Sequence, residues 1–175
     1  LTRDILETAG HKTGLISTVE YSYGERAISA SRTTPDACDL QELLAAMRDD
    51  GCSQVVMEGS SHALDQQRIG GMRLASAAFT NLSRDHLDYH RDFETYFAAK
   101  FRLFTQLAQT HPGAPAIVNR DDPYGLKLLD QLEQLPLRVL SFGSDERAEI
   151  RAEDIRLNPS GSRFHLCTPQ GCAMV

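Results

Sequence analysis

Short apolar segments alternate with longer amphipathic ones along the chain, and no other feature limits the fold as strongly. Four runs have the length and composition of strands that are largely buried: 54–58, 74–80, 116–118 and 137–142. Three segments carry apolar residues at helical spacing: 39–50, with Asp39 as the expected N-cap, 92–109 and 123–135. Such alternation predicts an α/β fold in which a mostly parallel sheet is flanked by helices.

The two ends of the chain depart from this pattern. Residues 1–10 are typical of the last turns of a helix closed by Gly10. Strands are expected at 14–19 and 21–28, with a turn at Gly24. From residue 150 onward, the turn at 158–161 between two strand-like stretches predicts an antiparallel hairpin region.

Composition excludes several classes of protein. The chain of 175 residues has 18 Lys and Arg against 24 Asp and Glu, which argues against a nucleic-acid partner. No stretch reaches the roughly 20 apolar residues that span a bilayer, so we expect a cytoplasmic protein with no membrane partner. We also expect a monomer. The four cysteines show no CxxC pair and no zinc-type spacing, which favours reduced, mostly buried thiols.

Polar residues gather where three predicted strands end. Because ligands bind beyond the carboxyl ends of strands in open α/β sheets, we expect the three clusters to share one sheet edge. The clusters run from Glu58 to Arg68, from Thr80 to His90 and from Asn119 to Asp122. Each cluster alone is equally consistent with a solvated loop that caps a helix.

Lys100 is the most informative single residue. It lies three residues after Phe97 and four before Phe104, on the apolar stripe of the predicted helix 92–109. Burial would lower the pKa of its amine and leave it neutral and nucleophilic, able to form a carbamate with CO2. The pattern alone favours a simpler interpretation, in which the stem packs and the charged head reaches solvent.

Glu58 and His86 have side chains that suit a divalent cation, although their spacing is not specific. A helix-capping glutamate and a hydrogen-bonded histidine are the alternatives. A different class of function is also open, a metal-dependent hydrolase in which Glu58, Asp85, His86 and His90 surround the ion. The segment 10–13 is not a phosphate-binding loop, because the required glycine pattern is absent.

Five motifs together resemble the central domain of the Mur ligase family, and within it the MurE type. They are Thr33-Thr34-Pro35; Met57-Glu58-Gly59-Ser60-Ser61-His62-Ala63-Leu64 with Arg68; Phe79-Thr80-Asn81-Leu82-Ser83-Arg84-Asp85-His86-Leu87-Asp88-Tyr89-His90; Ala99-Lys100 with Leu103-Phe104; and Val118-Asn119-Arg120-Asp121-Asp122-Pro123-Tyr124-Gly125. The resemblance covers the whole chain. The Ser60-Ser61-His62 segment with its downstream arginine is the most discriminating part.

The resemblance implies an ATP- and Mg2+-dependent ligase of peptidoglycan synthesis. Such an enzyme adds the third amino acid, meso-diaminopimelate or L-lysine, to UDP-N-acetylmuramoyl-L-alanyl-D-glutamate through an acyl phosphate. By the same resemblance, the metal would be held by Glu58, His86 and Lys100 as a carbamate, which are also the catalytic positions. Thr33, Thr34, Ser60, Gln66 and Arg68 match substrate-binding positions, and Asn119 and Asp122 match positions beside the adenine nucleotide.

The sequence differs from the family pattern at a few positions, and each difference leads to an expectation. Arg32 stands where asparagine is usual, and Gly59 stands where valine is usual, which should loosen local packing. The family's phosphate-binding loop is missing, so we expect a central ATPase domain over 1–149, its hairpin portion over 150–175, and no ligase turnover by these residues alone. A folylpolyglutamate-type ligase and a non-catalytic remnant remain alternatives.

Overall fold

The computed structural model describes residues 1–85 and 87–175, with only the backbone described at Leu87. The residues cluster into two compact units, unit 1 over Leu1–Gly71 and unit 2 over Met72–Val175. Unit 1 has a four-stranded sheet and unit 2 a six-stranded sheet. The expected division into 1–149 and 150–175 stays a prediction.

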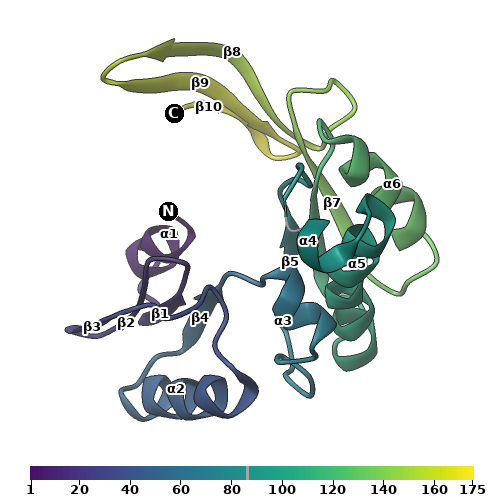
Figure 1. Ribbon diagram of the computed structural model, residues 1–175. Helices are drawn as coiled ribbons and strands as arrows, with labels where there is room; N and C mark the ends of the chain where they lie inside the picture. The colour runs from purple at the N-terminus through teal and green to yellow at the C-terminus, as the bar shows by residue number, and fades with distance from the viewer. Residues whose placement is uncertain (86) are drawn as a thin grey trace. The chain divides into compact units, whose positions relative to one another are not determined.

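Unit 1 combines a small mixed sheet with three helices (Figure 1). In chain order its elements are α1 (Thr2–Thr8), β1 (Thr13–Ile16), β2 (Glu20–Tyr23), β3 (Arg26–Ser29), α2 (Ala37–Asp49), β4 (Gln54–Met57) and α3 (Ser61–Asp65). The strand order is β3-β2-β1-β4, and β1 and β4 are parallel. The carboxyl ends of β1 and β4 therefore lie side by side.

Helix α2 packs tightly on β1. Leu40 and Met47 of α2 are fully buried, and a Cβ built at Gly14 of β1 would lie 2.5 Å from the Met47 sulfur. The N-cap of the helix is Asp36, three residues before the expected cap Asp39. Strand β4 is less buried than the sequence predicts, since Val55 is 37% exposed.

The predicted helix end at Gly10 is confirmed. Gly10 has φ +88°, and the N–H groups of Gly10 and His11 donate to the carbonyls of Glu7 and Leu6. These two bonds form a Schellman motif, which requires a left-handed residue at this point.

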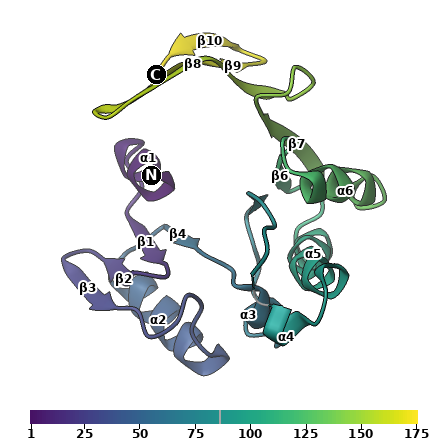
Figure 2. The same ribbon diagram turned by 45° about the horizontal axis from the view of Figure 1, so that its top comes forward.

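Unit 2 places parallel strands beside an antiparallel extension (Figure 2). Its elements are β5 (Ala77–Phe79), α4 (Leu87–His90), α5 (Phe93–Thr110), β6 (Pro115–Asn119), α6 (Pro123–Leu132), β7 (Arg138–Gly143), β8 (Ile150–Asn158), β9 (Gly161–Thr168) and β10 (Gly171–Met174). The order is β10-β9-β8-β7-β6-β5, parallel from β5 to β8 and antiparallel from β8 to β10. The fold class and the C-terminal hairpins are confirmed.

The core of unit 2 forms where α5 and α6 cover the parallel strands. Phe104 and Leu107 of α5, Val118 of β6 and Leu128 of α6 are each at most 1% exposed and belong to one apolar cluster. This cluster fixes the helix that carries Lys100 against the sheet.

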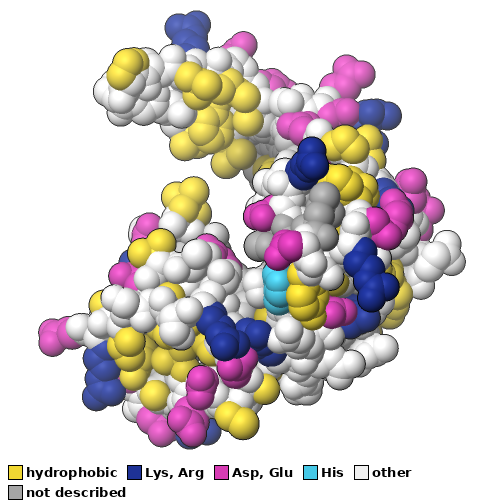
Figure 3. Space-filling view, viewed as in Figure 1, with side chains coloured by type: hydrophobic (Ala, Val, Ile, Leu, Met, Phe, Trp, Pro, Cys, Tyr) yellow, Lys and Arg dark blue, Asp and Glu magenta, His cyan; other side chains and the backbone are white. Residues whose placement is uncertain are grey.

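The antiparallel extension exposes an apolar face. The register places Leu166 of β9 between Ala152 of β8 and Ala173 of β10, with their side chains on one face. Leu157 and Val175 are 77% and 57% exposed, and hydrophobic side chains gather over this segment in Figure 3.

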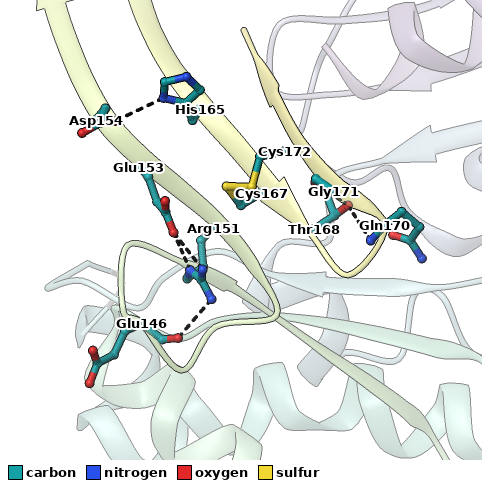
Figure 4. Close-up of a disulfide and its surroundings, with 10 residues drawn as sticks. All are labelled: Glu146, Arg151, Glu153, Asp154, His165, Cys167, Thr168, Gln170, Gly171 and Cys172. Carbon is teal, nitrogen blue, oxygen red and sulfur yellow. Dashed lines mark hydrogen bonds and ion pairs between the residues drawn. A yellow bond between two sulfur atoms is a disulfide. The ribbon is translucent and has the colours of Figure 1, made fainter.

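The expectation of four reduced cysteines is wrong. Cys167 and Cys172 form a disulfide between neighbouring residues of β9 and β10 (Figure 4). The short turn between the strands brings the two residues opposite each other, a pairing that a search for CxxC spacing misses. Cys38 and Cys52 are free.

Candidate functional site

Glu58 directly follows β4 and contacts the loop that follows the parallel strand β1. The N–H and the hydroxyl of Thr18 both donate to Glu58 Oε2, at 2.9 and 2.6 Å. The hydroxyls of Thr18 and Thr33 share a hydrogen bond of 3.2 Å. Thr18 was not among the predicted site residues, although it lies near the end of the predicted strand 14–19 as Glu58 lies at the end of 54–58.

Thr34 ties the loop before α2 to the loop after β4. Its hydroxyl is buried, donates to the Glu58 carbonyl at 2.8 Å and accepts from the Ser60 N–H at 3.0 Å. The Ser60 hydroxyl caps α3 by accepting from the Ala63 N–H at 3.2 Å. Both hydroxyls therefore shape the backbone around Glu58.

Gly59 lies after β4 and not within it. A Cβ built there would meet no atom of the described residues within 4 Å. The expectation that glycine loosens packing here is therefore wrong, because a side chain at this position would point into open space.

Arg68 is held on several sides. Its Nη1 donates to the Thr34 carbonyl at 3.0 Å, and its Nε and Nη2 donate to Gln66 Oε1 at 3.0 and 2.6 Å. Its Nε also lies 3.3 Å from the Asp36 carboxylate. Unit 1 thus brings Ser60, Gln66 and Arg68, which belong to the predicted cluster, together with Glu58. Thr33 and Thr34, which only the family resemblance named, lie beside them. Asp36 was not among the predicted site residues.

A second edge lies in unit 2, where β5 and β6 end. Asn119 Nδ2 donates to the Thr80 carbonyl at 2.8 Å. Asp122 caps α6 by accepting from the N–H groups of Tyr124 and Gly125. The second and third polar clusters therefore share one edge, as expected. The first cluster does not share it, because β4 belongs to the other sheet.

Lys100 lies beside an aromatic ring of the same helix, α5. Its Nζ is 5.3 Å from the centre of the Tyr96 ring, which is one helical turn earlier. The Tyr96 ring in turn stacks on His90 with 5.0 Å between centroids, and His90 is 1% exposed. Burial lowers the pKa of the Lys100 amine, which agrees with the direction expected from its place on the stripe.

A family model described as Mur ligase middle domain matches residues 1–175. The chain belongs to this family. Two curated relatives share the name UDP-N-acetylmuramoyl-L-alanyl-D-glutamate--2,6-diaminopimelate ligase. The protein from Geobacter sulfurreducens is 42% identical over 99% of this chain and 34% of its own length. The protein from Thermosynechococcus vestitus is 44% identical over 98% of this chain and 33% of its own length. The chain thus spans about a third of the length of these relatives.

Solved structures agree with the family assignment. One with the same enzyme name superposes with a TM-score of 0.87 at 27% identity, over 98% of this chain and 34% of that chain. A MurF ligase from Thermotoga maritima in complex with ADP has a TM-score of 0.65 at 15% identity, over 99% of this chain and 35% of that chain, and shows a shared fold alone.

The metal positions expected for a Mur ligase middle domain divide between the units. Glu58 lies in unit 1 and Lys100 in unit 2, and His86 lies outside the described residues. Within residues 1–85 and 87–175, no group of three or more His, Cys, Asp and Glu side chains could hold a metal ion. None of the helices in these ranges is long and apolar enough to cross a bilayer.

Proposed function

We propose that this chain is the middle domain of an ATP-dependent ligase that adds meso-diaminopimelate to UDP-N-acetylmuramoyl-L-alanyl-D-glutamate. The main support is sequence identity above 40%, over nearly the whole chain, to curated relatives with that name. The substrate carboxylate would attack the γ-phosphorus of ATP, releasing ADP and forming an acyl phosphate. The incoming amine would then displace phosphate and lose a proton to give the amide.

Unit 1 would bind the nucleotide-linked dipeptide. The Thr34 hydroxyl bonds to the Glu58 carbonyl and to the Ser60 N–H, and the Thr34 carbonyl accepts from Arg68, so these loops have a fixed shape before any ligand arrives. Gln66 holds the Arg68 guanidinium, and the Thr33 hydroxyl bonds to that of Thr18. A guanidinium group held in this way is pre-organised to pair with a carboxylate or a phosphate.

Unit 2 would approach the adenine nucleotide through the edge formed by β5 and β6. Asn119 and Asp122 already bond to the backbone of Thr80, Tyr124 and Gly125. Their main contribution would therefore be to shape the loop against the nucleotide and not to donate a free side chain to it.

The Glu58 carboxylate is an oxygen donor that suits a Mg2+ ion. Glu58 Oε2 is held by Thr18, and among the described residues no group donates to its other oxygen, Oε1. Burial lowers the pKa of the Lys100 amine, which increases the share of the neutral form that CO2 needs to form a carbamate. Glu58 and carbamylated Lys100 would supply the oxygen ligands that Mg2+ prefers, and His86 would add a nitrogen ligand, as the family resemblance implies. The bound ion would supply charge neutralisation during phosphoryl transfer.

The test of the reaction is phosphate release by the complete protein that carries this chain. Release should require ATP, Mg2+, the UDP-linked dipeptide and diaminopimelate together, and lysine should replace diaminopimelate poorly. Arg68→Ala should raise KM for the dipeptide about tenfold or more, because a charged pairing is lost. Metal-dependent hydrolysis without nucleotide would favour a hydrolase and contradict the proposal.

The carbamate has a readout apart from activity. Incubation with 13C-bicarbonate should give a carbamate carbon signal in the NMR spectrum that Lys100→Arg abolishes, because the guanidinium does not react with CO2. A signal of equal strength in the variant would contradict the assignment to Lys100. The monomeric state, the cytoplasmic location and the absence of a nucleic-acid partner stay predictions.

A further inference from the structure

Asp36 occupies the N-cap position of α2 without capping the helix. Aspartate is among the best N-cap residues because its carboxylate accepts from the free N–H groups of the first turn. Here the side chain makes no such bond. When a good capping residue does not make the capping hydrogen bond, its side chain contacts other groups, and positions that break a local rule in this way tend to be functional.

The Asp36 carboxylate instead faces two arginines. Arg32 Nη1 lies 2.8 Å from Asp36 Oδ1, and Arg68 Nε lies 3.3 Å from the same oxygen. Two guanidinium groups meet one carboxylate, which leaves one positive charge in excess. All three residues belong to unit 1.

The two arginines differ in how firmly they are held. The Arg68 side chain is 14% exposed, and the Thr34 carbonyl and Gln66 amide oxygen also hold it. The Arg32 side chain is 53% exposed. An arginine has five N–H donors, and within the part of the chain that the structure describes, the Arg32 side chain donates one hydrogen bond, to Asp36. Arg32 therefore has donors to spare beside a fixed guanidinium.

We propose that Asp36 is a positioning residue that holds Arg32 and Arg68 as a paired receptor for one anionic group of the substrate, a carboxylate or a phosphate. Arg32 is the second contact of this receptor and determines part of its specificity. The inference rests on the proposed function, because that function gives Arg68 its substrate.

Calorimetry of the complete protein with UDP-N-acetylmuramoyl-L-alanyl-D-glutamate tests the proposal. Asp36→Ser removes the carboxylate but keeps a good N-cap residue. Asp39→Ser is the matched control, because Asp39 is an exposed acid in the first turn of the same helix. We expect Asp36→Ser to weaken binding about tenfold, as for the loss of a charged hydrogen bond, and Asp39→Ser to change it less than about twofold.

The sign of the effect separates positioning from simple electrostatics. If Asp36 acted through its charge alone, removing it would strengthen the binding of an anion. If it positions the arginines, removing it weakens binding, raises KM and leaves kcat nearly unchanged. Arg32→Asn should weaken binding about threefold, and the combination with Asp36→Ser should cost less than the product of the two single effects.

A shortened ligand identifies the anionic group. With UDP-N-acetylmuramoyl-L-alanine, which lacks the glutamate, the effect of Asp36→Ser should vanish if the receptor binds a glutamate carboxylate. It should persist if the receptor binds the diphosphate. Either result supports the receptor.

Unchanged or tighter binding by Asp36→Ser, with melting temperatures equal to those of the control, would overturn the inference and leave the proposed function standing. Failure of the unsubstituted protein to bind the UDP-linked dipeptide would overturn the proposed function and the inference together.

Discussion

Gly125 shows how one residue can limit the packing of a helix against a strand. A Cβ built at Gly125, in the first turn of α6, would lie 1.8 Å from the carbonyl oxygen of Asn119. Because the obstacle is backbone, Gly125→Ala should destabilise the chain by about 3 kcal/mol, at the upper end of ordinary overpacking. Urea unfolding followed by circular dichroism measures this change.

Gly59→Ala is the control for that substitution, since a side chain at Gly59 meets open space in the described part of the chain. We expect a change within about 0.5 kcal/mol, as for most surface substitutions. Equal losses of unfolding free energy in the two variants would show that the close approach at Gly125 does not determine the stability of this packing.

The types of residue in the sequence indicate the location of the polar sites well. They indicate less well what each side chain does at its site. Ser60 and Asp122 were expected to contact ligands, and the structure shows both as helix caps. A cap and a ligand contact need the same oxygen atoms, so the sequence pattern alone does not separate them. Asp36 is the reverse case, because its sequence context suits a cap and its carboxylate contacts arginines.

At the scale of elements, α5 depends on its N-cap. Asp92 accepts from the Thr95 N–H at 2.7 Å, and this bond is the main cause that lowers the pKa of the Asp92 carboxyl below its ordinary value of 3.8. A lowered folded pKa stabilises the protein at pH values above the unfolded pKa, and this stabilisation is lost as the pH falls through the folded pKa. Asp92→Ala should therefore lower the melting temperature at pH 7 and have less effect near pH 2.

Asp92→Ser separates the charge from the cap. Serine caps a helix without titrating, so this variant should retain most of the stability at pH 7 and lose the dependence on acid pH that Asp92 contributes. A deficit of Asp92→Ala that is the same at pH 7 and pH 2 would contradict the role given to the carboxylate.

The disulfide between β9 and β10 should affect both the number of free thiols and the stability of the chain. Without reductant, the denatured chain should titrate two thiols of its four cysteines, Cys38 and Cys52. Cys172→Ser should destabilise the oxidised chain by up to about 2 kcal/mol, because the bond closes a short loop in the unfolded state. Cys38→Ser, an exposed position, should have no such effect. Four free thiols in the absence of reductant would contradict the pairing.

The elements themselves were largely predictable because their apolar periodicity is local. The helix 92–109 and the strand 116–118 correspond to α5 and β6 within about two residues at each end. The strand predicted at 74–80 is shorter in the structure, because only Ala77–Phe79 pair with β6. Which strands share a sheet depends on pairing between distant segments, and no local pattern shows that β4 and β5 belong to different sheets.

At the scale of the whole molecule, the two units differ in the core that each can build. Unit 2 contains an apolar cluster that joins α5, α6 and the parallel strands. Unit 1 has 71 residues, Leu1–Gly71, and a unit of that size buries only about 60% of the surface of its unfolded chain. Its β3 strand is exposed at all four residues.

Hydrogen exchange followed by mass spectrometry should therefore give slower exchange for amides of α5 and β6 than for those of β1 and β4, since protection follows local burial and stability. Amides of β3 should exchange fastest among the strands of unit 1. Glu58 and Arg68 lie in unit 1, so the segment from Glu58 to Arg68 should open more readily than the helix that carries Lys100. The UDP-linked dipeptide should then slow exchange in unit 1, as any ligand that binds only the folded state stabilises it. Equal protection of both units without ligand would contradict this ranking of the two cores.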